Sequence, residues 1–289
     1  MNTYNEARKV SIVTIIANAV LAVAKLVVGL LAGSVSVLSD AVHTFSDVGT
    51  TFAVMVGLKL SSSSADSDHP YGHQRIESLV SVLLAIALGG TAVLIGVEGA
   101  QSLWSGKRAE PSIAALIVTV LSIGGKEWMF RYTKAAATRL NSLSLMADAW
   151  HHRTDAVSSI AVLVGVGGNM LGVWWLEPVA AIGVSVLILK AAFDILREAF
   201  SQLTDRSLAQ EDLDRISEIA RSTDGVKAID DLRARISGNV AFVDIDIAVE
   251  RTLSVEAAHD IAESVHDRVE AAGLRVRHCM VHVNPWYGE

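Results

Sequence analysis

The sequence predicts an α-helical membrane protein with six transmembrane helices, followed by a small α+β domain at the C-terminal end. Two observations support this fold class. Hydrophobic residues make up 51% of the 289 residues and charged residues only 19%, a balance typical of membrane proteins. After Asp205 the composition changes to that of a soluble domain. We therefore expect a transmembrane domain over residues 1–206 and a second, soluble domain over residues 207–289.

Six apolar stretches account for the first domain, because each is close to the length of about 20 residues that crosses a bilayer as a helix. They span residues 10–31, 35–60, 79–103, 112–129, 143–171 and 179–200. If the spans alternate, Arg131, Lys134 and Arg139 lie with most other basic residues in connections on one side, whereas Lys107 and Arg108 lie on the other. The positive-inside rule then places both termini in the cytoplasm of a multi-pass protein of the cell (inner) membrane.

The second domain is expected to contain two helices and three strands in the order αββαβ. These elements are predicted over residues 210–222, 226–236, 240–249, 254–271 and 274–283. Ser237, Gly238 and Asn239 form a hairpin signal between the first two strands, and Ser254 is a suitable N-cap for the second helix. A domain of about 80 residues is near the lower limit for a stable core, so we expect a second copy of the chain to cover part of its surface.

Two HxxxD motifs in separate spans are the main functional signal. His43 precedes Asp47 by four residues, and His151 precedes Asp155 by the same distance. On a helix this spacing places both side chains of a pair on one face. Two neutral imidazoles and two carboxylates suit tetrahedral zinc, and the carboxylates offset the charge of a divalent ion inside the bilayer. Nitrogen and oxygen ligands also suit a site that must release its ion.

A plainer alternative is that both histidines are packed in the core and hydrogen-bonded to the aspartates. Two such pairs with identical spacing favour a metal site, because each ionisable group in a membrane is costly. Asp40 and Asp148 each precede a histidine by three residues, and either orient it or line a cavity. His152 lies about 100° around the helix from His151, which makes it a neighbour rather than a ligand.

A polar loop between the second and third spans carries a further candidate metal site. Asp66, His69 and His73 have a spacing that suits a metal ion, but a polar loop can also carry histidines without a ligand. Sequence alone leaves both interpretations open.

The C-terminal domain contains other candidate ligands on its predicted strands. His278 and His282 share one face of the last strand because their spacing is even. The residues that could join His282 at a metal ion are Asp230, Asp246 and His259. Solvated surface residues are the default interpretation of this set, and His266 and Cys279 are interpreted as structural.

Several classes of function are disfavoured. Cys279 is the only cysteine, so the chain has no internal disulfide and no site with several thiolates. The net charge of −7, without a basic patch, argues against a nucleic-acid partner. The sequence contains no HExxH motif, and four protein ligands leave no position for a catalytic water, so we expect no enzyme. An intramembrane metalloenzyme remains a remote alternative, as does a receptor that senses metal without moving it.

Three segments extend the pattern beyond the HxxxD motifs. They read GSVSVLSDAVHTFSD over residues 33–47, DHPYGHQRIESL over residues 68–79 and LTDRSL over residues 203–208. Together with the six spans and the αββαβ tail, the chain resembles the cation diffusion facilitator family over nearly its whole length.

The resemblance implies a homodimer that exports a divalent metal ion from the cytoplasm, usually in exchange for protons, without a prosthetic group. It implies that His43, Asp47, His151 and Asp155 form the transport site, and that the loop residues form a site near the membrane surface. Histidine at the first position of the second-span motif favours zinc as the transported ion. The same carrier with iron, manganese or cadmium as its main substrate is the alternative.

The resemblance also has implications at the start and within the tail of the C-terminal domain. Arg75 and Asp205 match a charge pair at the dimer junction. Asp230, Asp246 and His282 stand in places similar to a two-metal site found in the tail of some bacterial members. Asn284, however, stands where an aspartate is expected.

Overall fold

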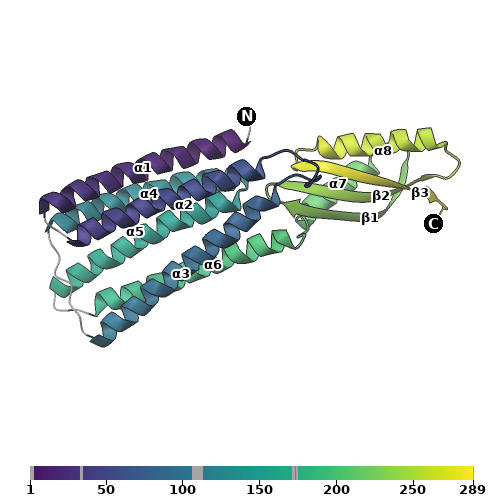
Figure 1. Ribbon diagram of the computed structural model, residues 1–289. Coiled ribbons are helices and arrows are strands. Elements are labelled where there is room, and N and C mark those ends of the chain that lie inside the picture. The colour runs from purple at the N-terminus through teal and green to yellow at the C-terminus, as the bar shows by residue number, and fades with distance from the viewer. Residues whose placement is uncertain (1–2, 33–34, 106–112, 171–172, 174, 289) are drawn as a thin grey trace. The chain divides into compact units, whose positions relative to one another are not determined.

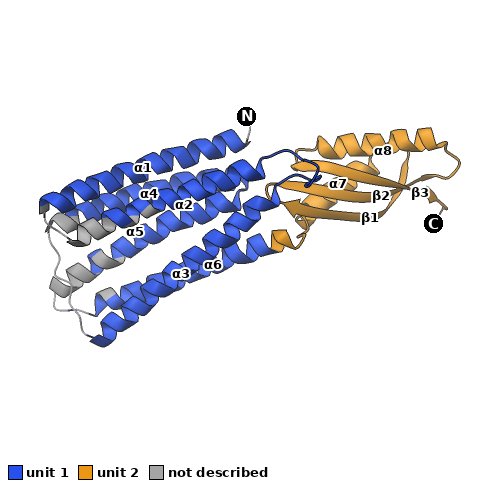
Figure 2. Cartoon of the chain, viewed as in Figure 1, with its two compact units in different colours: residues 1–200 blue, residues 201–289 orange. Residues whose placement is uncertain are grey.

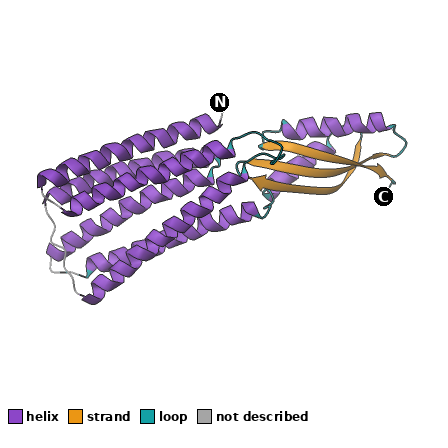
Figure 3. Cartoon of the chain, in the orientation of Figure 1, coloured by secondary structure: helices purple, strands orange, loops and turns teal. Residues whose placement is uncertain are grey.

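The computed structural model describes residues 3–32, 35–105, 113–170, 173 and 175–288. The chain divides into two compact units, residues 1–200 and residues 201–289 (Figure 2). The first unit is helical, whereas the second contains all the strands of the described residues (Figure 3).

The first unit contains six long helices in its described residues, in the predicted order. They are α1 (Thr3–Ala32), α2 (Val35–Ser61), α3 (Arg75–Ser105), α4 (Ile113–Leu140), α5 (Leu143–Met170) and α6 (Leu176–Leu203). Within the described chain, α1, α3 and α6 are long and apolar enough to cross a membrane by length and composition alone. The other three helices carry the polar and charged residues from which the site is built.

The helices pack closely where small residues line the contacts. α1 lies along α2 and α4 lies along α5. α3 runs beside α6, and buried residues of both helices share one apolar cluster (Figure 1). Small residues of α3 permit the last contact: a Cβ atom added to Gly99 would lie 3.1 Å from the carbonyl oxygen of Pro178 and 3.3 Å from the Cβ of Ala181. Gly96 meets Ser185 of α6 in the same way. A stripe of small residues on α3 therefore brings α6 close.

Helix α4 is longer than its apolar stretch, which corrects the predicted end of the fourth span. The prediction ended this span at residue 129 and placed Arg131, Lys134 and Arg139 in the following loop, but all three lie within α4. Residues 130–140 contain neither glycine nor proline and include three consecutive alanines, so nothing in the sequence stops the helix. It ends at Leu140, and Asn141 then takes a left-handed backbone conformation with φ of 54°.

The second unit has the predicted αββαβ order. Its elements are α7 (Gln210–Arg221), β1 (Val226–Ser237), β2 (Val240–Glu250), α8 (Val255–Glu270) and β3 (Val276–Trp286). The sheet order is β1-β2-β3, with β1 antiparallel and β3 parallel to β2. Ser254 is the N-cap of α8, as predicted: its side chain accepts a hydrogen bond from the backbone N–H of Ala257 at 3.1 Å.

Both helices of this unit cover a common apolar core with the sheet. Ile216 of α7, Ile245 and Ile247 of β2, and Val265 of α8 are almost fully buried in one cluster. Cys279 of β3 belongs to the same cluster. The predicted structural role of this cysteine is consistent with its position.

Candidate metal centre

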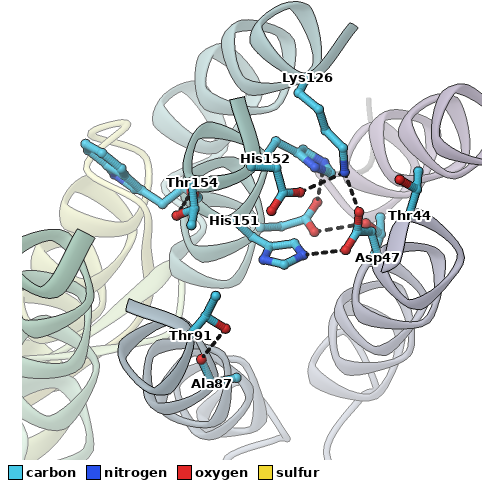
Figure 4. A network of polar contacts seen from close by, with 12 residues as sticks. Thr44, Asp47, Ala87, Thr91, Lys126, His151, His152 and Thr154 are labelled. Atoms are coloured by element: carbon cyan, nitrogen blue, oxygen red, sulfur yellow. Dashed lines mark hydrogen bonds and ion pairs between the residues drawn. The ribbon is translucent and has the colours of Figure 1, made fainter. Parts of the chain in front are cut away.

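Three of the four predicted transport ligands meet between α2 and α5. Asp47 of α2 is 1% exposed, and its Oδ1 atom lies 3.1 Å from Nε2 of His151 on α5. Asp155 lies one turn further along α5, and Asp47, His151 and Asp155 offer ligand atoms that are all within 4.8 Å of one another. Figure 4 shows His151 turned toward Asp47 across the gap between the two helices. The four-residue spacing of the α5 pair therefore does place both groups at one cluster.

A lysine that the sequence analysis did not assign to the site lies among these ligands. Lys126 of α4 is 2% exposed, and its Nζ atom lies 2.5 Å from Asp47 Oδ2 and 2.8 Å from Asp155 Oδ2 (Figure 4). One ammonium thus bridges the carboxylates of α2 and α5. The available signal is a lysine inside the predicted fourth span, residues 112–129, because an ionisable group at that depth usually faces the protein interior. The two carboxylates that it contacts could not be predicted from the sequence, because the contact depends on how α2, α4 and α5 pack together.

Two candidate residues of α2 lie outside the described side chains. His43 lies in α2 four residues before Asp47, and Asp40 lies one turn earlier still. The part of His43 as the fourth ligand therefore stays a prediction that rests on its spacing.

A second buried polar group lies behind the cluster. Asp148 of α5 is fully buried, and its Oδ1 atom accepts a hydrogen bond from Thr51 of α2 at 3.0 Å. Its other oxygen lies 3.6 Å from Nε2 of His152, which is also fully buried. Asp148 therefore holds α5 against α2 through Thr51. His152 does not belong to the cluster of Asp47, His151 and Asp155, and its part as a neighbour rather than a ligand stays a prediction.

Charged contacts also fix α4 against α5 beside Lys126. Glu127 accepts hydrogen bonds from Arg153 of α5 and, at 2.7 Å, from Arg131 of α4. The Arg153 guanidinium also lies 4.8 Å from the ring centroid of Phe130. These contacts set the rotation of α4 and so help to aim Lys126 at the carboxylates.

Comparison with known proteins settles the family. A model of the cation efflux transmembrane domain matches residues 11–204, and a model of the cation efflux protein cytoplasmic domain matches residues 208–286. The chain belongs to the cation efflux family. This cation efflux protein is therefore a divalent-cation transporter rather than an enzyme. It is a multi-pass membrane protein whose C-terminal domain is cytoplasmic, and the predicted fold class is confirmed.

Curated relatives share nearly the whole chain. An uncharacterized transporter of Methanocaldococcus jannaschii is 35% identical over 96% of this chain and 98% of its own. Metal tolerance protein 2 of Oryza sativa subsp. japonica is 36% identical over 92% of this chain and 75% of its own. The manganese efflux system protein MneP of Bacillus subtilis is 30% identical over 98% of this chain and 97% of its own.

The loop of this cation efflux protein brings its three predicted ligands together. Nδ1 of His69 lies 3.4 Å from Asp66 Oδ1, and Nε2 of His73 lies 3.4 Å from Asp66 Oδ2. Nδ1 of His73 lies 3.2 Å from the carbonyl oxygen of Ser64, which leaves Nε2 directed at the aspartate. A hydrogen bond from the backbone N–H of His69 holds the pKa of the Asp66 carboxyl below its usual value. An ionised carboxylate with two imidazoles beside it is a suitable cation site.

The predicted tail ligands are not gathered in the same way. Asp246 and His282 are neighbours across β2 and β3, but Asp230 accepts a hydrogen bond from Asn284 at 2.8 Å. His259 of α8 instead lies 3.6 Å from Glu263. Among the described residues, no cluster of three ligand groups contains any of these four residues within one chain. Asn284, which replaces the aspartate that the resemblance leads one to expect, thus uses its side-chain amide to donate a hydrogen bond to Asp230.

Proposed function

We propose that the protein exports zinc from the cytoplasm by proton antiport, through a tetrahedral site made of His43, Asp47, His151 and Asp155. The supporting observation is the cluster of Asp47, His151 and Asp155, in which ligand atoms from two helices lie within 4.8 Å of one another. His43 completes the set by its position one turn before Asp47 in α2. Two imidazoles and two carboxylates then form the N2O2 set that zinc accepts without a geometric preference of its own.

Manganese is the second candidate ion. A relative that is 30% identical carries the name of a manganese efflux protein. Manganese prefers oxygen ligands, whereas imidazole suits zinc. Two imidazoles in a set of four favour zinc over manganese here.

Lys126 must move for an ion to bind between the carboxylates. Its ammonium lies 2.5 Å and 2.8 Å from the oxygens of Asp47 and Asp155 that would face the metal. A divalent ion and an ammonium at the same place would repel each other strongly in a buried site. Loading therefore replaces the single charge of Lys126 by the double charge of the metal.

Release at the outer side follows when protons compete for the ligands. Histidine has an unperturbed pKa of about 6.5, so it can exchange a proton for a metal ion at physiological pH. Metal binding requires the neutral imidazole, so a proton and the ion exclude each other at His151. Alternating exposure of the site to the two sides of the membrane then couples the two fluxes.

Two further features extend the proposal. Asp66, His69 and His73 form a metal site in the loop, because their ligand atoms also lie within 4.8 Å of one another. The protein functions as a homodimer through its cytoplasmic domain, which matches a family model named for dimerisation. The small size of this domain favours such a partner.

The test is zinc flux into proteoliposomes under an imposed pH gradient. Asp155→Ala should reduce the flux to that of protein-free liposomes, because it removes a ligand at the centre of the cluster. Asp194→Ala is the matched control, since it removes a carboxylate from an exposed position on α6. If both variants transport zinc equally well, the proposed site is wrong. If the wild type moves manganese but not zinc, and Asp155→Ala stops it, the site stands and the ion is manganese.

A further inference from the structure

We propose that His266, Glu270 and His278 form a second divalent-metal site in the cytoplasmic domain, between the C-terminal turn of α8 and the start of β3. The site is separate from the transport site and shares no residue with the tail set Asp230, Asp246, His259 and His282. It lies within one chain, so it does not require a second copy of the protein.

The three side chains converge on one carboxylate oxygen. Nε2 of His266 lies 3.2 Å from Glu270 Oε1, and Nδ1 of His278 lies 3.4 Å from the same atom. The three groups offer ligand atoms that all lie within 4.8 Å of one another. His266 and Glu270 are four residues apart on α8 and share a face, while His278 is contributed by β3.

The backbone of Cys279 holds two of these groups in place. Nδ1 of His266 lies 2.7 Å from the carbonyl oxygen of Cys279, and because a carbonyl only accepts, Nδ1 carries the hydrogen and donates it. The N–H of Cys279 donates to Glu270 Oε1 at 3.1 Å. An imidazole that donates its second ring nitrogen to a backbone carbonyl is the usual orientation of a metal-binding histidine.

This orientation creates a need for a cation. With Nδ1 of His266 protonated, the neutral ring directs the lone pair of Nε2 at a carboxylate oxygen 3.2 Å away. Two acceptors face each other at that distance only if a proton or a metal ion lies between them. His278 presents a ring nitrogen to the same oxygen, and the two ring centroids are 5.5 Å apart.

A single metal ion satisfies all three groups better than two protons do. Protonating both rings would place two positive charges side by side, with one carboxylate to offset them. One divalent ion instead binds two neutral imidazoles and the carboxylate, which is the His2Glu set of zinc sites with one position open for water. The side chains of His266, Glu270 and His278 are 31%, 31% and 46% exposed, so an ion can reach them from the cytoplasm.

Binding there would fasten the end of α8 to β3. The segment between them, residues 271–275, is a turn in which Gly273 and Arg275 have positive φ angles of 74° and 57°. A metal ion that bridges the two elements adds a constraint across this turn. The cytoplasmic domain should therefore become more stable when zinc is present.

The test is zinc binding by the full-length protein in detergent, measured by equilibrium dialysis after removal of metal. His266→Gln and His278→Gln should each bind one zinc ion fewer per chain than the wild type at saturation. Glu263→Gln is the matched control, because it changes an exposed carboxylate on the same helix that lies outside the cluster. When Co²⁺ replaces zinc, the protein should show visible absorption bands of tetrahedral Co²⁺ from this site. These bands should be weaker in both variants than in the wild type.

The outcomes separate this site from the transport site. Asp155→Ala should lose a different ion, so the double variant Asp155→Ala/His278→Gln should lose two. Equal zinc binding by His266→Gln, His278→Gln and Glu263→Gln would overturn the site of His266, Glu270 and His278, whatever Asp155→Ala does. If Asp155→Ala binds as much zinc as the wild type, this counts against the transport site but leaves the site of His266, Glu270 and His278 standing. Glu270→Gln provides a third variant with an unchanged side-chain shape, in case a histidine variant fails to fold.

Discussion

At the centre of the bundle, the ammonium of Lys126 lies between two carboxylates that would otherwise face each other in a buried space. Asp47 and Lys126 are almost completely shielded from solvent. A buried charge is tolerated when an opposite charge and hydrogen bonds offset the loss of water, and removal of one partner leaves the other uncompensated. Lys126 therefore stabilises the two carboxylates of the cluster, and in the proposed transport site it would compete with the metal for them.

Replacing Lys126 should strengthen metal binding and weaken the metal-free protein. Lys126→Met removes the ammonium that a divalent ion must displace. Coupling energies of close charge pairs at buried interfaces are about 1.5–7 kcal/mol, so zinc should bind at least about tenfold more tightly. Isothermal titration calorimetry in detergent measures the dissociation constant, and thermal unfolding without metal should show a lower Tm.

Lys190→Met is the control for this variant, because Lys190 is a largely exposed lysine on α6. Lys126 has no part in metal loading if Lys126→Met binds zinc no more tightly than Lys190→Met does. A lower Tm of Lys126→Met that zinc restores would show that the two carboxylates need a cation of either kind.

Spacing rules explain which site residues could be predicted from the sequence. His151 and Asp155 share a face because residues four apart on a helix are neighbours, and their convergence with Asp47 followed from the repeated motif. The contact of Lys126 depends on the rotation of α4, which Arg153 and Glu127 help to set. No local pattern contains that information.

The cluster of His266, Glu270 and His278 could not be predicted from the sequence for a similar reason. The sequence alone favours a structural part for His266, and no local pattern indicates that His278 of β3 lies beside it. Their contact depends on how far β3 extends past the turn that follows α8, and on which residue of β3 pairs with β2. His278 pairs with Phe242 of β2, and in this register its Nδ1 atom lies 3.4 Å from Glu270 of α8. A shift of one residue would turn it to the other face.

At the scale of helices, the close contact between α3 and α6 requires glycine at position 99 but not at position 90. Gly99→Val should lower the free energy of unfolding by about 1–3 kcal/mol, since a Cβ there would lie 3.1 Å from a backbone oxygen of Pro178 that cannot turn away. Gly90→Val is the control on the same helix, because a Cβ there meets no atom within 4 Å. Thermal unfolding in detergent compares the two, and an equal Tm would contradict the close contact.

The length of α4 shows what apolar stretches do and do not predict. Hydropathy marks the part of a helix that lies in the hydrocarbon, whereas the helix itself ends where the backbone changes conformation at Asn141. The polar turns of α4 form contacts of their own: Arg139 pairs with Glu6 of α1. The start of α3 behaves in the same way: the predicted third span begins at residue 79, but α3 begins at Arg75. Glu77 is buried in this first turn and accepts hydrogen bonds from Ser142 and Ser144.

At the scale of the whole molecule, each unit has an apolar core of its own. The cytoplasmic domain packs α7, α8 and the sheet into one cluster, and the helical unit has separate clusters. The composition of the sequence predicts this division, because long apolar spans before residue 205 give way to a mixed polar and apolar pattern after it. Units with separate cores unfold in separate steps unless a large interface couples them.

Cys279 allows this expectation to be tested in the full-length protein. Burial raises the pKa of its thiol to about 12, so the folded domain presents almost no thiolate at pH 8, while the unfolded chain has a pKa near the usual value of about 8.5 and reacts. Alkylation by iodoacetamide during heating should therefore begin at the temperature at which the cytoplasmic domain unfolds. This temperature should differ from that of the loss of the helical circular dichroism signal of the membrane unit. A single coincident transition would contradict independent units.

The position of Lys126 has a consequence for the cell. A carrier whose site is occupied by its own side chain becomes half-loaded only at a higher ion concentration than a vacant site would, because the ion must first displace that side chain. Export would then slow while some metal is still present in the cytoplasm. A single residue of α4 would in this way help to set the cytoplasmic concentration of divalent metal at which export begins.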